Sequence, residues 1–177
     1  MKEPQVIEPR GLPLAVVLAI HRMQIDRFGG GEGLRDQGLL ESALARPQQL
    51  FHYGDDVGIP QLAAAYAFDI ARNHPFLDGN KRTAFMVAAV FMEDNGWAVE
   101  LAQVDVVLKI LALATAELAE RELAAWLEAG SRLVVEGTSA ATEGSGPKPH
   151  FTAISARLGM ARSLWSRLEG DCAHAVR

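Results

Sequence analysis

The chain has 177 residues, of which 49% are hydrophobic, so it is long enough for one ordinary domain with a sizeable core and an appendage. Its formal net charge of −5 argues against broad nucleic-acid binding by the whole chain. The single cysteine excludes an intrachain disulfide framework and is typical of a reducing cytoplasm, and the polar start from Met1 to Arg10 is unlike a signal peptide.

The N-terminal part predicts two helices joined by a glycine-rich loop. A helix is expected over Leu14–Phe28, and its apolar start is too short to span a bilayer, so we expect no membrane contact. The loop over Gly29–Gly38 lacks the spacing of a Walker motif and is interpreted as a mobile flap. Asp36 should cap a short second helix that ends at Arg46, because Pro47 follows.

The next two helices are predicted to flank a polar loop. A helix should begin at Pro60 and end near Asn73, because Leu62, Tyr66 and Ile70 form an apolar stripe. A second helix, over about Asn80–Asp94, is apolar on nearly every side and therefore belongs in the middle of a bundle.

The rest of the chain predicts further helices and a tail. Helices are expected over Gln103–Leu118 and Glu120–Leu127, with at most a short extended segment over Trp97–Leu101, so the fold class is all-α. We divide the chain into a helical domain over 1–130, a linker over 131–149 and a short helical tail over 150–177.

The predicted tail differs in charge from the rest of the chain. Residues 1–144 hold 12 Lys or Arg and 20 Asp or Glu, whereas residues 145–177 hold five and two. The tail weakly resembles a DNA-binding helix-turn-helix, with Gly159 at the turn. An ordinary solvated amphipathic tail is the favoured alternative, because two helices alone cannot bury a core.

The loop between the two central helices gathers reactive side chains at a helix N-terminus, where free N–H groups and the helix dipole attract anions. His74 suits proton removal near neutral pH, Asp78 suits Mg²⁺, and Gly79 permits close approach of the backbone. The side-chain amide of Asn80 and the cations of Lys81 and Arg82 can bind phosphate. Transfer of a phosphate-containing group from a nucleotide to a hydroxyl fits this set. The candidate site residues are His74, Asp78, Gly79, Asn80, Lys81 and Arg82, of which His74, Lys81 and Arg82 are expected to act in catalysis.

His-Pro-Phe-Leu-Asp-Gly-Asn-Lys-Arg, over residues 74–82, resembles the Fic/Doc family. It matches the Doc (death-on-curing) pattern HxFx(D/N)(A/G)NKR at every fixed position, and the resemblance extends over roughly residues 12–129. This implies a Fic/Doc helical bundle around a central buried helix. His21 and His52, which lack metal-ligand spacing, are expected to be structural.

The sequence departs from the Fic form HxFx(D/E)GNGRxxR at two positions, where Lys81 replaces a glycine and Phe85 replaces the second arginine. The resemblance to Doc implies that the nucleotide binds reversed, so that the γ-phosphate of Mg²⁺-bound ATP is transferred. It also implies a threonine of elongation factor Tu as the target, arrested translation, and a Phd-type antitoxin as the neutralising partner. The alternatives are a Fic-type adenylyltransferase, or a vestigial-site protein that acts on DNA through its basic tail.

Overall fold

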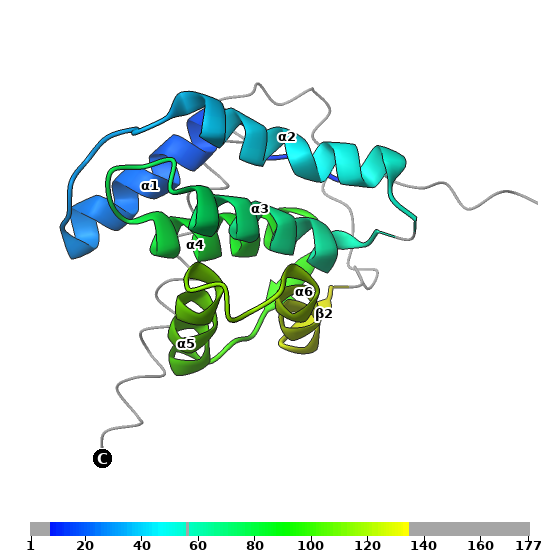
Figure 1. Cartoon of the computed structure of the whole chain (residues 1–177). Coiled ribbons are helices and arrows are strands. Elements are labelled where there is room, and N and C mark those ends of the chain that lie inside the picture. The colour runs from blue at the N-terminus through cyan, green and yellow to red at the C-terminus, as the bar shows by residue number, and fades with distance from the viewer. Residues whose placement is uncertain (1–7, 56, 135–177) are drawn as a thin grey trace, which may run out of the picture.

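The computed structural model describes residues 8–55 and 57–134, which form a helical bundle (Figure 1). The predicted all-α class is confirmed. In chain order the elements are α1 (Leu14–Phe28), α2 (Gln37–Tyr53), α3 (Ile59–Asn73), α4 (Asn80–Asp94), β1 (Trp97–Val99), α5 (Gln103–Ala114), α6 (Glu120–Ala129) and β2 (Ser131–Leu133).

Helix α4 is the centre of the molecule, as its apolar sequence predicts. Every side chain from Thr83 to Met92 is buried, and α4 packs against α1, α3, α5 and β1. Figure 1 shows α3 and α4 between α1 and α2 on one side and α5 and α6 on the other. Each large apolar side chain in such a position contributes about 1.5–3 kcal/mol. The N-terminus of α4, where the polar loop ends, is therefore held by a rigid core.

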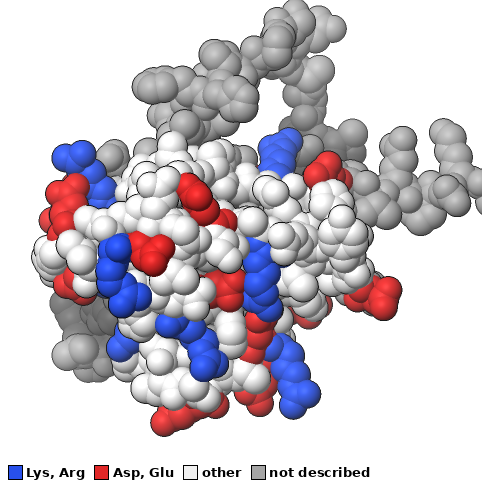
Figure 2. Space-filling model, turned by 45° about the horizontal axis from the view of Figure 1, so that its top comes forward, with Lys and Arg blue, Asp and Glu red and all other residues white. Residues whose placement is uncertain are grey.

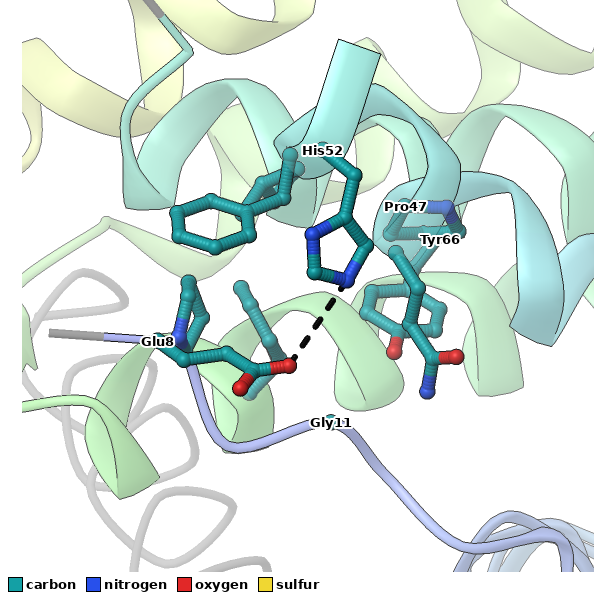
Figure 3. A pocket seen from close by; sticks show the side chains of 10 residues that line it. Glu8, Gly11, Pro47, His52 and Tyr66 are labelled. Carbon is teal, nitrogen blue, oxygen red and sulfur yellow. Dashed lines mark ion pairs between the residues drawn. The ribbon is translucent and has the colours of Figure 1, made fainter. Parts of the chain in front are cut away.

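We predicted that α2 ends at Arg46. The helix instead continues to Tyr53, and Pro47 lies inside it. Pro47 is buried and lines a small apolar cavity together with Phe51 and Tyr66 (Figure 3). A proline costs a helix one backbone hydrogen bond. Here the last two turns stay helical because they pack against the core, and this packing outweighs the local propensity.

The segment before α1 is held against α2 and the C-terminal end of α4. Glu8 forms an ion pair with His52 of α2, at 3.7 Å between Oε1 and Nε2 (Figure 3). The backbone N–H of Arg10 donates to Asn95 Oδ1 at 2.7 Å, and Asn95 Nδ2 donates to the carbonyl of Arg10 at 3.1 Å. The two hydrogen bonds with Asn95 hold the start of the described chain against the end of α4, whereas the pair between Glu8 and His52 lies on the surface.

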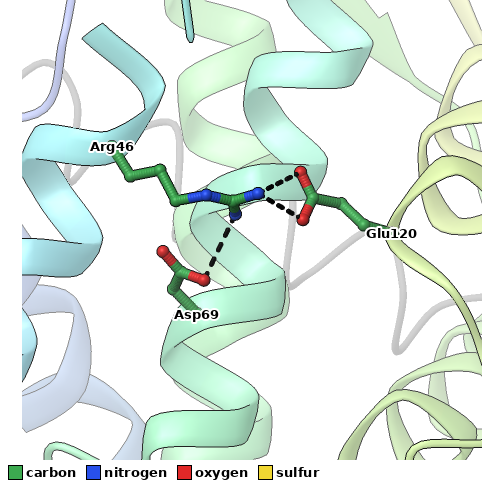
Figure 4. Close-up of polar contacts among 3 residues, drawn as sticks. All are labelled: Arg46, Asp69 and Glu120. Carbon is green, nitrogen blue, oxygen red and sulfur yellow. Dashed lines mark hydrogen bonds and ion pairs between the residues drawn. The ribbon is translucent and has the colours of Figure 1, made fainter. Parts of the chain in front are cut away.

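One arginine joins three helices (Figure 4). Arg46 donates to Asp69 Oδ1 at 3.2 Å and to both oxygens of Glu120, at 3.0 and 2.7 Å. Burial raises the pKa of Asp69 above its ordinary value of 3.8, outweighing Arg46, which lowers it. The two-pronged contact with Glu120 ties α2 to α6, and the contact with Asp69 ties it to α3.

The first three residues of the predicted linker over 131–149 form a strand. Ser131–Leu133 pair antiparallel with β1, with Ala98 opposite Arg132, and Val134 N–H donates to the Gly96 carbonyl at 2.7 Å. Backbone pairing with β1 therefore makes the first residues of the expected linker part of the folded domain. The remainder of that linker and the predicted tail over 150–177 lie outside the described residues. In the part that the structure describes, no helix is long and apolar enough to cross a membrane.

Candidate active site

The loop between α3 and α4 brings all six sequence-predicted site residues to one place. An open cleft of about 350 Å³ is lined by Leu77 and by those six residues, His74, Asp78, Gly79, Asn80, Lys81 and Arg82. The backbone turns sharply at both ends of the loop. His74 ends α3 with φ 51°, and Gly79 precedes α4 with φ 73°.

The imidazole of His74 is available for chemistry. Its side chain is half-buried, and no hydrogen-bond partner for it exists among residues 8–55 and 57–134. A left-handed backbone costs a non-glycine residue free energy and is found mostly where the surroundings impose it. Here the left-handed backbone directs the side chain of His74 from the end of α3 into the cleft.

The glycine-rich segment before α2 is paired with the loop. Gly33 and Arg35 form backbone hydrogen bonds with Leu77 and Pro75, at 3.0 and 2.7 Å, around an antiparallel bridge between Leu34 and Phe76. We predicted a mobile flap over this segment. The structure instead anchors its second half, because strand-like pairing satisfies backbone groups that a free loop would leave to solvent.

Asn80 differs from its expected role as a side-chain ligand for phosphate. Its Oδ1 accepts from Phe76 N–H and its Nδ2 donates to the Phe76 carbonyl, both at 2.9 Å, and the side chain is buried. The amide therefore closes the loop on itself. Asn80 can still offer a phosphate its backbone N–H at the start of α4.

The N-terminus of α4 has the features of an anion site. No side chain caps it, and Thr83 N–H is the first amide of α4 that has a backbone acceptor, the Gly79 carbonyl at 2.9 Å. The preceding amides point out of the helix end, where the helix dipole adds positive potential. Lys81 is exposed there, so its ammonium can reach the cleft.

Arg82 is oriented by the end of α1. Its Nη2 donates to the Gly29 carbonyl at 3.1 Å, and its guanidinium lies over the Phe28 ring at 5.2 Å from the centroid. Sequence reasoning did not foresee these two contacts. They hold the guanidinium beside the cleft and couple it to the start of the glycine-rich segment.

Asp78 is the one carboxylate that lines the cleft. Its side chain is exposed, and its Oδ1 accepts from Gly79 N–H at 2.6 Å. The described ranges contain no group of three or more His, Cys, Asp or Glu side chains that could hold a metal. A single carboxylate fits Mg²⁺, which commonly takes one or two protein oxygens and completes its shell with water and substrate phosphates.

His21 also belongs to this site, although the sequence suggested only a structural role. It is 4% exposed, its ring stacks on Phe76 at 3.9 Å between centroids, and its Nε2 lies 2.9 Å from the Asp78 carbonyl oxygen. A histidine within the buried apolar stripe of α1, beside Val17 and Ile20, was the available signal. Such a residue needs a polar partner, and that partner is the loop.

The charges on the visible surface do not form a single patch. On the face in Figure 2, acidic and basic side chains are interspersed among uncharged residues. The acidic side chains on this face therefore do not mark a partner surface there.

Comparison with known proteins agrees with the motif. Residues 11–92 match the model of the Fic/DOC family. The chain is 50% identical over 72 residues to the protein named Toxin Doc from Mycolicibacterium smegmatis, covering 39% of this chain and 54% of that protein. It is 36% identical over 80 residues to the protein named Protein kinase doc from Escherichia phage P1, covering 45% of this chain and 64% of that one. The chain thus spans between half and two thirds of these relatives.

Proposed function

We propose that this chain is a protein kinase of the Doc branch of the Fic/DOC family. It transfers the γ-phosphate of ATP to a hydroxyl of a target protein. The observation that carries the proposal is the cleft at the α4 N-terminus, which gathers a histidine, a carboxylate and two cations. The name of the phage relative, a protein kinase, supports the same reaction.

His74 is the proposed general base. Its imidazole accepts the proton of the incoming hydroxyl while the oxygen forms its bond to the γ-phosphorus. The bond from that phosphorus to the bridging oxygen breaks, and ADP leaves with the electron pair. His74 suits this role because its side chain has no competing hydrogen bond among the described residues.

The remaining groups are proposed to bind the nucleotide as Mg-ATP. Asp78 would hold Mg²⁺, which neutralises charge on the phosphates when bound. The first-turn amides of α4, Lys81 and Arg82 would bind phosphate oxygens. Arg82 is already oriented by Phe28 and Gly29, so less side-chain entropy is lost on binding.

Lys81 favours phosphate transfer over AMP transfer. The Doc pattern has a lysine at this position, and the Fic pattern has a glycine there with an arginine at the position of Phe85. Phe85 is 2% exposed in the core of α4, so its side chain cannot reach a phosphate in the cleft. The alternative adenylyltransferase would therefore lack one of its phosphate ligands.

We further propose the biological setting that the resemblance implies. The target would be a threonine of elongation factor Tu, whose phosphorylation stops translation. A Phd-type antitoxin would neutralise the enzyme by covering its cleft. The alternative of a vestigial site with a DNA-binding tail rests on residues outside the described ranges.

The proposal can be tested by treating a bacterial lysate with the purified chain and Mg-ATP, followed by peptide mass spectrometry. A phosphate adduct on one hydroxyl-bearing residue is expected, and the His74→Ala variant should leave that peptide unmodified. An AMP adduct would establish the adenylyltransferase instead, and an unmodified proteome would contradict both enzymes.

A further inference from the structure

We infer that His21 is a positioning residue, which sets the orientation of the Asp78 carboxylate by holding the Asp78–Gly79 peptide. This inference rests on the proposed function, because it assigns Asp78 the binding of Mg²⁺. It concerns a side chain on α1, more than fifty residues away from the loop in sequence.

The hydrogen bond fixes which ring nitrogen of His21 carries hydrogen. Nε2 lies 2.9 Å from the Asp78 carbonyl oxygen, and a carbonyl can only accept. Nε2 must therefore be the donor. The ring plane is fixed as well, because it stacks on Phe76 with an interplanar angle of 5°. His21 is buried, so both contacts are shielded from water.

The peptide that His21 holds also fixes the carboxylate. In a trans peptide the N–H points opposite to the carbonyl, so the bond from His21 to the Asp78 oxygen sets the direction of Gly79 N–H. That N–H donates to Asp78 Oδ1 at 2.6 Å. A rotation of the peptide away from His21 would therefore rotate the donor that holds the carboxylate.

Close packing leaves little room for the peptide to adjust. A β-carbon built on Gly79 would lie 3.1 Å from Ile25 Cδ1 and 3.7 Å from His21 Nε2. The loop backbone thus contacts α1 directly. Glycine at this position serves the approach to α1, and its φ of 73° suits a residue without a side chain.

Four variants of the full chain separate orientation from simple packing. His21→Phe keeps a stacking ring and loses the donor. His21→Gln loses the ring but places an N–H₂ group near the position of Nε2, whereas the amide of His21→Asn is too short to reach. His52→Phe, on exposed α2 surface, is the matched control.

The first readout is the Mg²⁺ concentration at which ATP binding is half-maximal, measured by calorimetry. We expect His21→Phe and His21→Asn to raise it by about 10- to 100-fold, the usual effect of losing a partner that orients a metal ligand. His21→Gln should recover most of this loss, and His52→Phe should match the wild type. Equal impairment of the Gln and Asn variants, or wild-type Mg²⁺ dependence in both His21→Phe and His21→Asn, would overturn the inference.

The second readout does not depend on nucleotide. The amide ¹H–¹⁵N signal of Gly79 should shift in the Phe and Asn variants and return toward its wild-type position in the Gln variant. An unmoved signal in folded His21→Asn would contradict the inference. Should the wild-type chain bind no ATP at all, the proposed kinase function fails, while this signal still decides the role of His21.

Discussion

Gly30 and Asp78 lie so close together that a β-carbon on Gly30 would overlap the Oδ2 atom of the carboxylate. Gly30 also has a φ of 122°, a conformation that other residues rarely adopt. The first half of the glycine-rich segment therefore lies against the proposed Mg²⁺ ligand, and glycine at position 30 permits this approach.

Gly30→Ala is expected to displace either the segment or the carboxylate, and so to lower phosphate transfer by about tenfold or more. The measurement is the transfer rate as a function of Mg²⁺ concentration. Gly96→Ala is the control, since Gly96 has a similar positive φ of 82° but no atom within 4 Å of its built β-carbon. Equal rates in the two variants would show that the contact with Asp78 has no consequence.

His74→Ala should reduce transfer by about 10²–10⁴-fold, the usual contribution of a general base. Replacing histidine by alanine should change the strain of the left-handed backbone only slightly. The fold should therefore persist, and the thermal midpoint should stay near that of the wild type. His52→Ala, which removes a surface histidine, serves as control. Transfer at the wild-type rate by His74→Ala would refute the assigned role.

Asp78→Asn and Arg82→Ala should both weaken Mg-ATP binding, but in different ways. Loss of the carboxylate should raise the Mg²⁺ requirement, whereas loss of the guanidinium should weaken nucleotide binding by about 1.5–3 kcal/mol at saturating Mg²⁺. Calorimetric titration separates the two effects. Arg132→Ala removes an exposed arginine paired with Glu100, far from the loop in sequence, and should bind as the wild type does. Unchanged affinity in both site variants would remove these residues from the site.

Asp69 should give the bundle a distinctive pH dependence. Burial raises its pKa, so the folded protein binds this proton more tightly than the unfolded chain does. The raised pKa of Asp69 therefore stabilises the folded protein below pH 3.8, the ordinary pKa of this group. This stabilisation is lost as pH rises through the raised pKa. Relative to the wild type, Asp69→Asn should gain stability over that rise in pH. Urea unfolding at a series of pH values tests this, and a stability difference independent of pH would contradict it.

The sequence predicts the elements that build the site better than the contacts that orient it. The bounds of α1 follow from apolar periodicity and those of α4 from a continuous apolar run, with glycines near their ends, and these are local signals. The continuation of α2 through Pro47 was not predicted, because it depends on packing against the core. The strand Ser131–Leu133 was not predicted, because it depends on pairing with β1.

The same distinction holds within the cleft. His74 and Asp78 lie in one short motif, so their proximity could be predicted from spacing. His21 approaches Asp78 only through the packing of α1 on α4, and Phe28 meets Arg82 in the same way. Contacts between residues far apart in sequence depend on the tertiary arrangement, which no local pattern contains.

The central claim is that the chain transfers the terminal phosphate of ATP, and Lys81 is the residue that most distinguishes this reaction from AMP transfer. The direct measurement compares ATP labelled at the γ-position with ATP labelled at the α-position, each incubated with the chain and a bacterial lysate. We predict label on a target protein from γ-labelled ATP alone, with loss of that label in Lys81→Gly. Label from the α-position with the wild-type chain would contradict the account and establish an adenylyltransferase in its place.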